Sequence, residues 1–179
     1  MAPKGRATIT SRVFITREPP LRRLWSRTLV WWDSLAPNQR RTVNALSLCI
    51  VGFIAHYLVF TVSQPFYIED AGISFAYARN LIEGHGLVTY PGGERVEGYS
   101  NPTWTFLIAF FLLFKISPWV SSKVLGAVFG AMVLPLAWAI TRRARGGVDD
   151  LINLAPSFLL AASTQFVLWN GSGLENSVF

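Results

Sequence analysis

Two adjacent acidic residues, Glu69 and Asp70, follow directly after a long uncharged apolar run. A carboxylate in this position could take the proton from a hydroxyl group while that hydroxyl attacks a sugar carbon. Arg79 and His85 come later in the same loop and could hold a departing phosphate through charge-assisted hydrogen bonds. The residue types and their order therefore suit a glycosyl transfer beside a membrane surface.

The same residues also have structural interpretations, which the spacing leaves open. Acidic residues are favoured at the start of a helix by capping and by the helix dipole. Arg79 and Glu83 are four positions apart and could pair on a helix surface. His85 could cap the loop that follows. Spacing alone thus does not separate a substrate site from a set of helix-stabilising contacts.

An interfacial helix over residues 70–83 is predicted to carry the acidic pair at its start. Its apolar residues recur at helical spacing and would form one face, made of Ile73, Ala76, Tyr77 and Leu81. Gly84 comes just after the periodic stretch and favours a helix stop. We expect this helix to lie along the outer membrane surface.

The remainder of this loop contains several glycines. Residues 87–90 and 94–96 flank the turn sequence Pro-Gly-Gly at 91–93, a pattern that predicts a small hairpin or a tight hook. Tyr99 and Trp104 border the return of the chain toward the membrane. Aromatic rings of this kind suit the head-group layer.

The composition places these elements in an integral membrane protein. The chain has 179 residues, of which 51% are hydrophobic and 15% charged, whereas a soluble domain carries about 25% charged residues. The net charge of +6 does not indicate a nucleic-acid partner, because nine Lys and Arg residues fall within residues 1–41. A basic segment ahead of an apolar run is typical of a cytoplasmic tail.

The first transmembrane helix is predicted at residues 42–63. Its uncharged core, residues 45–62, is long enough to cross a hydrocarbon layer of about 30 Å. Cys49 is expected to act as a small buried hydrophobe. His56 is expected to be neutral and bonded to a neighbouring helix rather than to face a polar cavity. Ahead of this helix, residues 21–35 could form an amphipathic surface helix or a juxtamembrane linker.

Three further apolar segments follow the external loop of residues 64–102, at 103–117, 123–141 and 151–169. The first is short for a span, and the last is interrupted by Pro156. Gly126 and Gly130 would give the middle segment a flat face for the close approach of another helix. Four alternating spans would break the positive-inside rule, because they would place outside the membrane Arg142, Arg143 and Arg145. The topology after the first span therefore stays open.

The predicted fold class is an all-α integral membrane protein, a multi-spanning helical bundle whose external loop carries an interfacial helix. Residues 170–179 contain neither a charge cluster nor a helix cap, and so resemble a sequence cut within a longer protein. We expect a multi-pass protein of the inner or plasma membrane of the cell, with its N-terminus in the cytoplasm.

Three stretches of the chain resemble a known family. They read EDAxISFxYARNLxEGHGLV at 69–88, RVEGYSNxxW at 95–104 and SGLE at 172–175. The two loop stretches, with the Pro-Gly between them, are similar to the first external loop of the multi-spanning glycosyltransferases of the GT-C fold. The greatest similarity is to the terminal β-arabinofuranosyltransferases of actinobacterial cell walls. Elsewhere in the chain only the hydropathy is similar.

This resemblance implies an inverting glycosyltransferase that moves a sugar, arabinofuranose being one candidate, from a polyprenyl-phosphate donor to a cell-envelope polysaccharide. It also implies an acidic residue of the loop as general base. The family usually has Asp-Asp where this chain has Glu69 and Asp70, so either residue is a candidate base. The resemblance implies no certain cofactor, and a divalent metal is compatible with it. The implied substrate-binding residues are Arg79, His85, Glu97, Tyr99 and Asn101.

Other functions remain open. The family normally has more membrane spans than this chain, which therefore resembles an N-terminal portion and could be inactive alone. It could instead be a non-enzymatic assembly or interaction subunit, as in relatives of this loop that are linked to flagellar motor control. A transporter fragment fits less well, because the apolar segments do not show the charged or broken stretches that line substrate paths.

Overall fold

The computed structural model describes residues 28–63, 66–99 and 101–176, and the chain divides into two units. The small unit, up to residue 36, contains a helix over residues 28–34. Within this helix, the Ser34 hydroxyl donates a hydrogen bond of 2.6 Å to the Trp31 carbonyl. The predicted surface helix at residues 21–35 is thus helical over its second half, and residues 21–27 lie outside the described residues.

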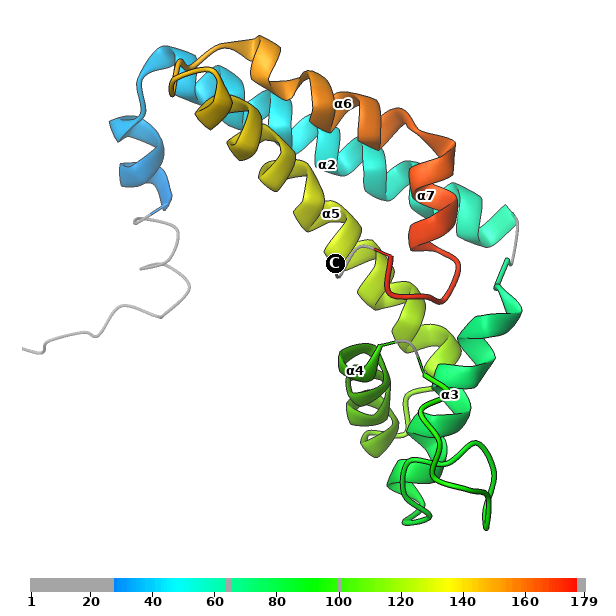
Figure 1. Cartoon of the computed structure of the whole chain (residues 1–179). Coiled ribbons are helices and arrows are strands. Elements are labelled where there is room, and N and C mark those ends of the chain that lie inside the picture. The colour runs from blue at the N-terminus through cyan, green and yellow to red at the C-terminus, as the bar shows by residue number, and fades with distance from the viewer. Residues whose placement is uncertain (1–27, 64–65, 100, 177–179) are drawn as a thin grey trace, which may run out of the picture. The chain divides into compact units, whose positions relative to one another are not determined.

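Two long antiparallel helices form the frame of the second unit, which begins at Pro37. Helix α2 (Pro37–Ser63) and helix α5 (Pro118–Ala144) have 27 residues each and are apolar enough to cross a membrane; such a helix rises about 40 Å. The Tyr57 hydroxyl of α2 donates to the Lys123 carbonyl of α5 at 2.8 Å, and Phe53 lies against Gly130. Because the residue numbers run in opposite directions along this contact, the two helices are antiparallel (Figure 1).

Gly126 and Gly130 permit this close packing, which confirms the predicted flat face. A Cβ atom at Gly126 would come within 2.0 Å of the Asn170 carbonyl oxygen. A Cβ atom at Gly130 would come within 2.6 Å of Cζ of Phe53. Any side chain at either position would therefore overlap a neighbouring segment.

A broken helix packs beside α2 and α5. It consists of the 3₁₀ turn η1 (Leu151–Leu154), α6 (Ala155–Ala162) and α7 (Thr164–Asn170), with a bend of 63° before α7. The break lies at Ser163, which has extended backbone, and not at Pro156 as the sequence analysis indicated. Pro156 occupies the first turn of α6, where proline removes no helical hydrogen bond.

His56 of α2 faces the broken helix, and Cys49 of α2 faces the apolar core beside it. Nδ1 of His56 lies 3.3 Å from the Ala161 carbonyl oxygen of α6. Because a carbonyl only accepts, Nδ1 carries the proton in this contact, and the predicted bond to a neighbouring helix is confirmed. Cys49 is half-buried and packs at the edge of an apolar cluster around Phe53 and Tyr57.

Two shorter helices follow α2 and pack against each other. Helix α3 (Glu69–Ile82) confirms the predicted helix, and Gly84, with φ +85°, follows its end. Helix α4 (Pro102–Leu113) has 12 residues and rises about 18 Å, which is less than the thickness of the hydrocarbon layer. The core that they share with α5 contains Ala71, Phe75, Ala78, Trp104, Ile108, Ala109 and Leu125.

The buried face of α3 differs from the predicted one. Tyr77 is fully buried, but Ile73 is 41% exposed, whereas Ser74 and Phe75 are buried. The helix is covered on one side by α4 and on another by the loop that bonds to Tyr77. Because α3 is covered on two sides, it buries residues outside the single apolar face that the periodicity predicted. Ile73, which was predicted on the buried face, is therefore exposed.

Residues 87–96 form a tight hook. The Gly93 amide donates to the Tyr90 carbonyl at 3.0 Å, and Gly92 has φ +80°. None of the residues that the structure describes forms a β-strand. Of the two predicted alternatives, the hook is therefore confirmed and the hairpin is wrong.

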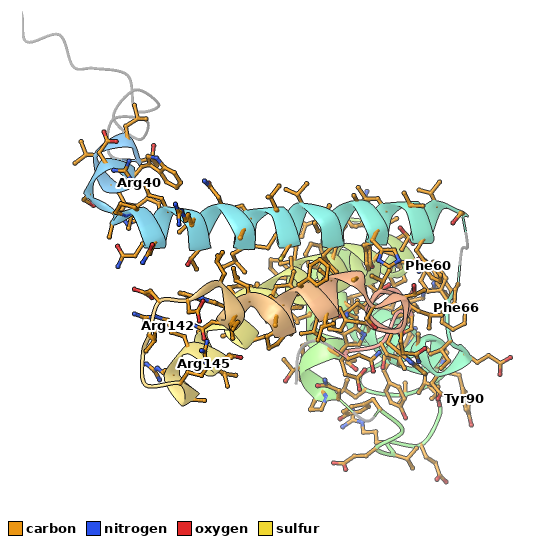
Figure 2. The ribbon with its side chains drawn as sticks, turned by 90° about the horizontal axis from the view of Figure 1, so that it is seen from above. Arg40, Phe60, Phe66, Tyr90, Arg142 and Arg145 are labelled. Carbon is orange, nitrogen blue, oxygen red and sulfur yellow. The ribbon has the colours of Figure 1, made fainter. Side chains whose placement is uncertain are left out.

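The arginines of α2 and α5 lie at the same end of the second unit. Figure 2 shows Arg40, Arg142 and Arg145 at one end and Tyr90 toward the other. The contacts of α5 with α2 show that α5 runs back toward the end at which α2 begins. The described chain is helical, with two helices that can span a membrane, or three if the broken helix is counted as one span.

Candidate functional site

The acidic pair occupies the first turn of α3, with both residues exposed. Glu69 and Asp70 are the first two residues of the helix, and the N-cap position belongs to Ile68, whose side chain makes no capping hydrogen bond. Within the described part of the chain, neither carboxylate has an ion pair or a hydrogen bond. Capping by these acids, one of the structural interpretations, is therefore not observed, although the helix dipole still favours their negative charge.

The segment after α7 docks against the start of α3. The Ile68 amide donates a hydrogen bond of 3.0 Å to the Ser172 carbonyl. Nε1 of Trp104 donates one of 3.1 Å to the Gly173 carbonyl. Gly173 has φ +93°, and a Cβ atom there would lie 3.0 Å from Cβ of Ala71. Two stretches that carry the family resemblance, the acidic loop and the SGLE tail, are thus in contact.

A lysine that the sequence analysis did not single out joins these segments. Lys123 is the only charged residue of α5 ahead of its terminal arginines. Its amino group donates a hydrogen bond of 2.7 Å to the Phe66 carbonyl and another to the Gly171 carbonyl. It also lies 4.0 Å from the centroid of the Tyr67 ring, within cation–π range. Because two of its three donors are bonded to backbone carbonyls and its charge lies against the Tyr67 ring, the amine is a structural link rather than a free anion-binding group.

Aromatic rings pack the linker before α3 onto α5. Tyr67 donates its hydroxyl to the Trp119 carbonyl at 2.8 Å, and the two rings meet edge to face with centroids 4.7 Å apart. Phe75 of α3 contacts the same Trp119 ring with a centroid distance of 5.0 Å. Burial raises the pKa of the Tyr67 hydroxyl, so the hydroxyl stays a neutral donor. The start of α3 is therefore fixed to α5.

The loop after α3 is fastened to the helix by two side chains. The Tyr77 hydroxyl donates to the Val96 carbonyl at 2.8 Å and accepts from the Gly98 amide at 3.1 Å. Nδ2 of Asn80 donates to the Val88 carbonyl at 2.8 Å. These side chains belong to the family-like pattern, and in this structure they hold the loop backbone against α3.

Two of the predicted substrate-binding residues lie far from the acidic pair. Arg79 and His85 are exposed near the C-terminal end of α3. Nε2 of His85 lies 4.0 Å from a carboxylate oxygen of Glu83. Among the described residues, Glu83 does not form the pair with Arg79 that the spacing suggested. Since α3 has 14 residues and rises about 20 Å, the structure does not bring His85 together with the acidic pair.

The other three predicted substrate-binding residues are in the segment between the hook and α4. Glu97 is exposed and lies between Val96 and Gly98, the two loop residues that bond to the Tyr77 hydroxyl. The Tyr99 ring meets the Tyr77 ring edge to face, with centroids 4.9 Å apart. Asn101 is 2% exposed and caps α4, because its Oδ1 accepts from the Trp104 amide at 3.2 Å. Its Nδ2 is buried and has no hydrogen-bond partner in the described part of the chain. Asn101 is linked to the segment after α7 through Trp104, whose Nε1 donates to the Gly173 carbonyl.

The acidic pair offers two adjacent carboxylates to a cation. No group of three or more His, Cys, Asp or Glu side chains suited to a metal occurs among the residues described. A divalent metal at this site would therefore need further ligands from a substrate phosphate or from water.

Comparisons of the chain with known proteins returned no relatives. No protein-family model, no curated protein and no solved structure matches it.

Proposed function

We propose that this chain forms the external acidic site of an inverting membrane glycosyltransferase. One observation carries the proposal: Glu69 and Asp70 are exposed and have no partner among the described residues, at a helix start that is itself fixed. The fixation comes from the hydrogen bond to Ser172 and from those that Lys123 donates. A general base needs a carboxylate that is free to accept a proton and that is held in place by a rigid element.

In the proposed reaction, one carboxylate of the pair removes the proton from a hydroxyl of a cell-envelope polysaccharide. The hydroxyl oxygen forms a bond to the anomeric carbon of the donor sugar, and the bond between that carbon and the phosphate oxygen breaks. Polyprenyl phosphate leaves with the bonding electrons, and the configuration at the sugar carbon inverts. A short linker separates the pair from the end of α2, which suits a donor whose lipid stays in the bilayer while its phosphate stays at the surface.

Arg79 and His85 are assigned to the acceptor in this proposal. Arg79 lies about 14 Å along α3 from Asp70, and His85 lies beyond the end of that helix, so both are too far to contact a phosphate that leaves the reacting carbon. Glu97 and Tyr99 continue this surface along the loop, so an extended polysaccharide could contact the group. Arabinofuranose as the transferred sugar is supported by the resemblance alone.

Sugar transfer from a polyprenyl-phosphate donor, measured in membranes that carry the protein, tests the proposal. Glu69→Gln and Asp70→Asn keep the side-chain size but remove the base, and one of them should lower the rate by about 10²- to 10⁴-fold. Glu94→Gln removes an exposed acid in the loop after α3 that is not assigned to substrate binding, and it should keep the wild-type rate.

Two results would contradict the proposal. If both variants of the pair keep about a tenth or more of the wild-type rate at normal abundance, the acids are not catalytic. If the wild-type protein transfers no sugar under conditions in which its membranes hold donor and acceptor, the assembly-subunit alternative is favoured.

A further inference from the structure

An apolar groove runs between α2 and the broken helix, toward the arginine-bearing end. It has a volume of about 680 Å³, within the range of about 300–1,000 Å³ that is usual for ligand sites. One wall is the stretch of α2 from residue 45 to residue 56, and the other comes from η1 and α6. The lining has one strongly polar side chain, His56, and its Nδ1 is already directed at the Ala161 carbonyl.

The length of the groove matches one leaflet of a membrane. From Ala45 to His56, which both line it, α2 rises about 17 Å. Half of the hydrocarbon layer is about 15 Å. The groove therefore offers a single acyl chain an apolar surface from the membrane interface to the bilayer centre.

A polar pocket of about 190 Å³ adjoins the groove at Leu151, which lines both. Two aspartates in the wall of this pocket are already neutralised. Asp149 pairs with Arg142 at 2.6 Å. Asp150 pairs with Arg145 at 3.3 Å. These carboxylates therefore neither attract a cation strongly nor repel an anion strongly.

Arg41 is the uncompensated charge in the pocket wall. It is exposed and makes no ion pair or hydrogen bond within the described part of the chain. Because Arg142 and Arg145 offset the two aspartates, Arg41 gives the pocket a net positive charge. A positive pocket that continues into an apolar groove is complementary to a phosphate attached to an acyl chain.

We propose that this groove binds one anionic phospholipid from the leaflet at the arginine-bearing end. The guanidinium of Arg41 donates hydrogen bonds to the phosphate, and one acyl chain lies between α2 and α6. The site is at the opposite end of α2 from the acidic pair and shares no lining residue with the proposed sugar-transfer site. A lipid held there supports the contact between α6 and α2, on which the position of α7 and the tail depends.

Native mass spectrometry of the full chain in mild detergent, with added dioleoyl phosphatidylglycerol or dioleoyl phosphatidylcholine, tests the head-group assignment. We expect one bound phosphatidylglycerol, retained at least about fivefold more than phosphatidylcholine, which is the factor typical of one basic residue near an anionic lipid. Arg41→Gln should remove this preference. Arg143→Gln makes the same charge change at an exposed position outside the pocket wall and should keep it.

Gly52→Leu tests the acyl-chain part of the site. Gly52 lines the groove, and a Cβ atom there meets no other atom within 4 Å, so a leucine side chain would start in open space and occupy part of the groove. Lipid retention should fall in this variant and persist in Val51→Phe, where the residue is 65% exposed and outside the groove. Equal retention of the two lipids, equal losses in the two arginine variants, or full retention in Gly52→Leu would overturn the proposal.

Discussion

The Ile68 amide donates a 3.0 Å hydrogen bond to the Ser172 carbonyl, and so the residue just before the acidic pair is joined to the end of the broken helix. Backbone atoms make this bond, which means that it depends on the path of the tail rather than on a side chain. Gly173 determines that path, because its φ of +93° is disfavoured for other residues.

Gly173→Ala should therefore destabilise the protein, and by roughly 1 kcal/mol more than Gly147→Ala. Both positions have positive φ, +93° and +81°, so the backbone strain is similar. A Cβ atom at Gly173 would lie 3.0 Å from Cβ of Ala71, whereas one at Gly147 meets nothing within 4 Å. Thermal unfolding of the two variants in detergent measures the difference, and equal losses would show that the tail does not pack tightly against α3.

Lys123→Met should loosen the start of α3. The substitution leaves the Phe66 and Gly171 carbonyls without the lysine donor, at a cost of about 1–3 kcal/mol. Lys115→Met is the matched control, because Lys115 is exposed just after α4. Hydrogen exchange at the Ile68 amide should become faster in the first variant and stay unchanged in the second. Unchanged exchange in both would rule out Lys123 as the link.

Asp150 should make the η1 turn sensitive to acid. The Ile152 amide donates to the Asp150 carboxylate at 3.3 Å and, together with Arg145, holds the pKa of this carboxyl below its ordinary value of 3.8. Because the pKa is lower in the folded state, the stabilisation is fully present above pH 3.8 and is lost as the pH falls through the lower folded value.

The amide resonance of Ile152, followed by NMR in detergent micelles, should report this titration. Its chemical shift should stay constant near neutral pH and change on acidification with a midpoint below 3.8, the ordinary value for the carboxyl. Asp150→Asn should abolish the change, and Glu94→Gln, at an exposed site in the other loop, should leave it intact. A midpoint above the ordinary value would contradict the direction of the shift.

Local features of the sequence predicted the helices well, because helix formation depends on nearby residues. The acidic start and the Gly84 stop bound α3 closely, and the glycine pair of α5 indicated a close contact. The partners in that contact, Phe53 and Asn170, lie far away in the chain and could not be inferred from the spacing. The same holds for the bond from Ile68 to Ser172.

The apolar segments do contain charged and broken stretches, whose expected absence counted against a transporter fragment. Lys123 lies within α5, and a 63° bend precedes α7. One signal was available in the sequence, since a single lysine in an otherwise apolar helix usually has a specific partner. The bend was not accessible, because it results from the extended backbone at Ser163 and not from the proline nearby.

The shortness of α4 leads to a prediction about topology. Its 12 residues rise about 18 Å, so we expect it to stay on the side of the acidic loop while α5 crosses back. The arginines at 142, 143 and 145 would then share the cytoplasmic side with the basic tail. Single cysteines in a Cys49→Ser background, treated with a membrane-impermeant maleimide in intact cells, can decide this.

Glu94→Cys and Arg143→Cys are suitable positions for the labels, because both residues are exposed. Ser74 in the acidic loop is unsuitable, since it is only 3% exposed and would resist labelling on either side of the membrane. We expect Glu94→Cys to react in intact cells and Arg143→Cys to react only after permeabilisation, as Ser11→Cys in the tail should. If Glu94→Cys and Arg143→Cys both react in intact cells while Ser11→Cys does not, α4 crosses the membrane after all, and the chain keeps four alternating spans despite the positive charge left outside.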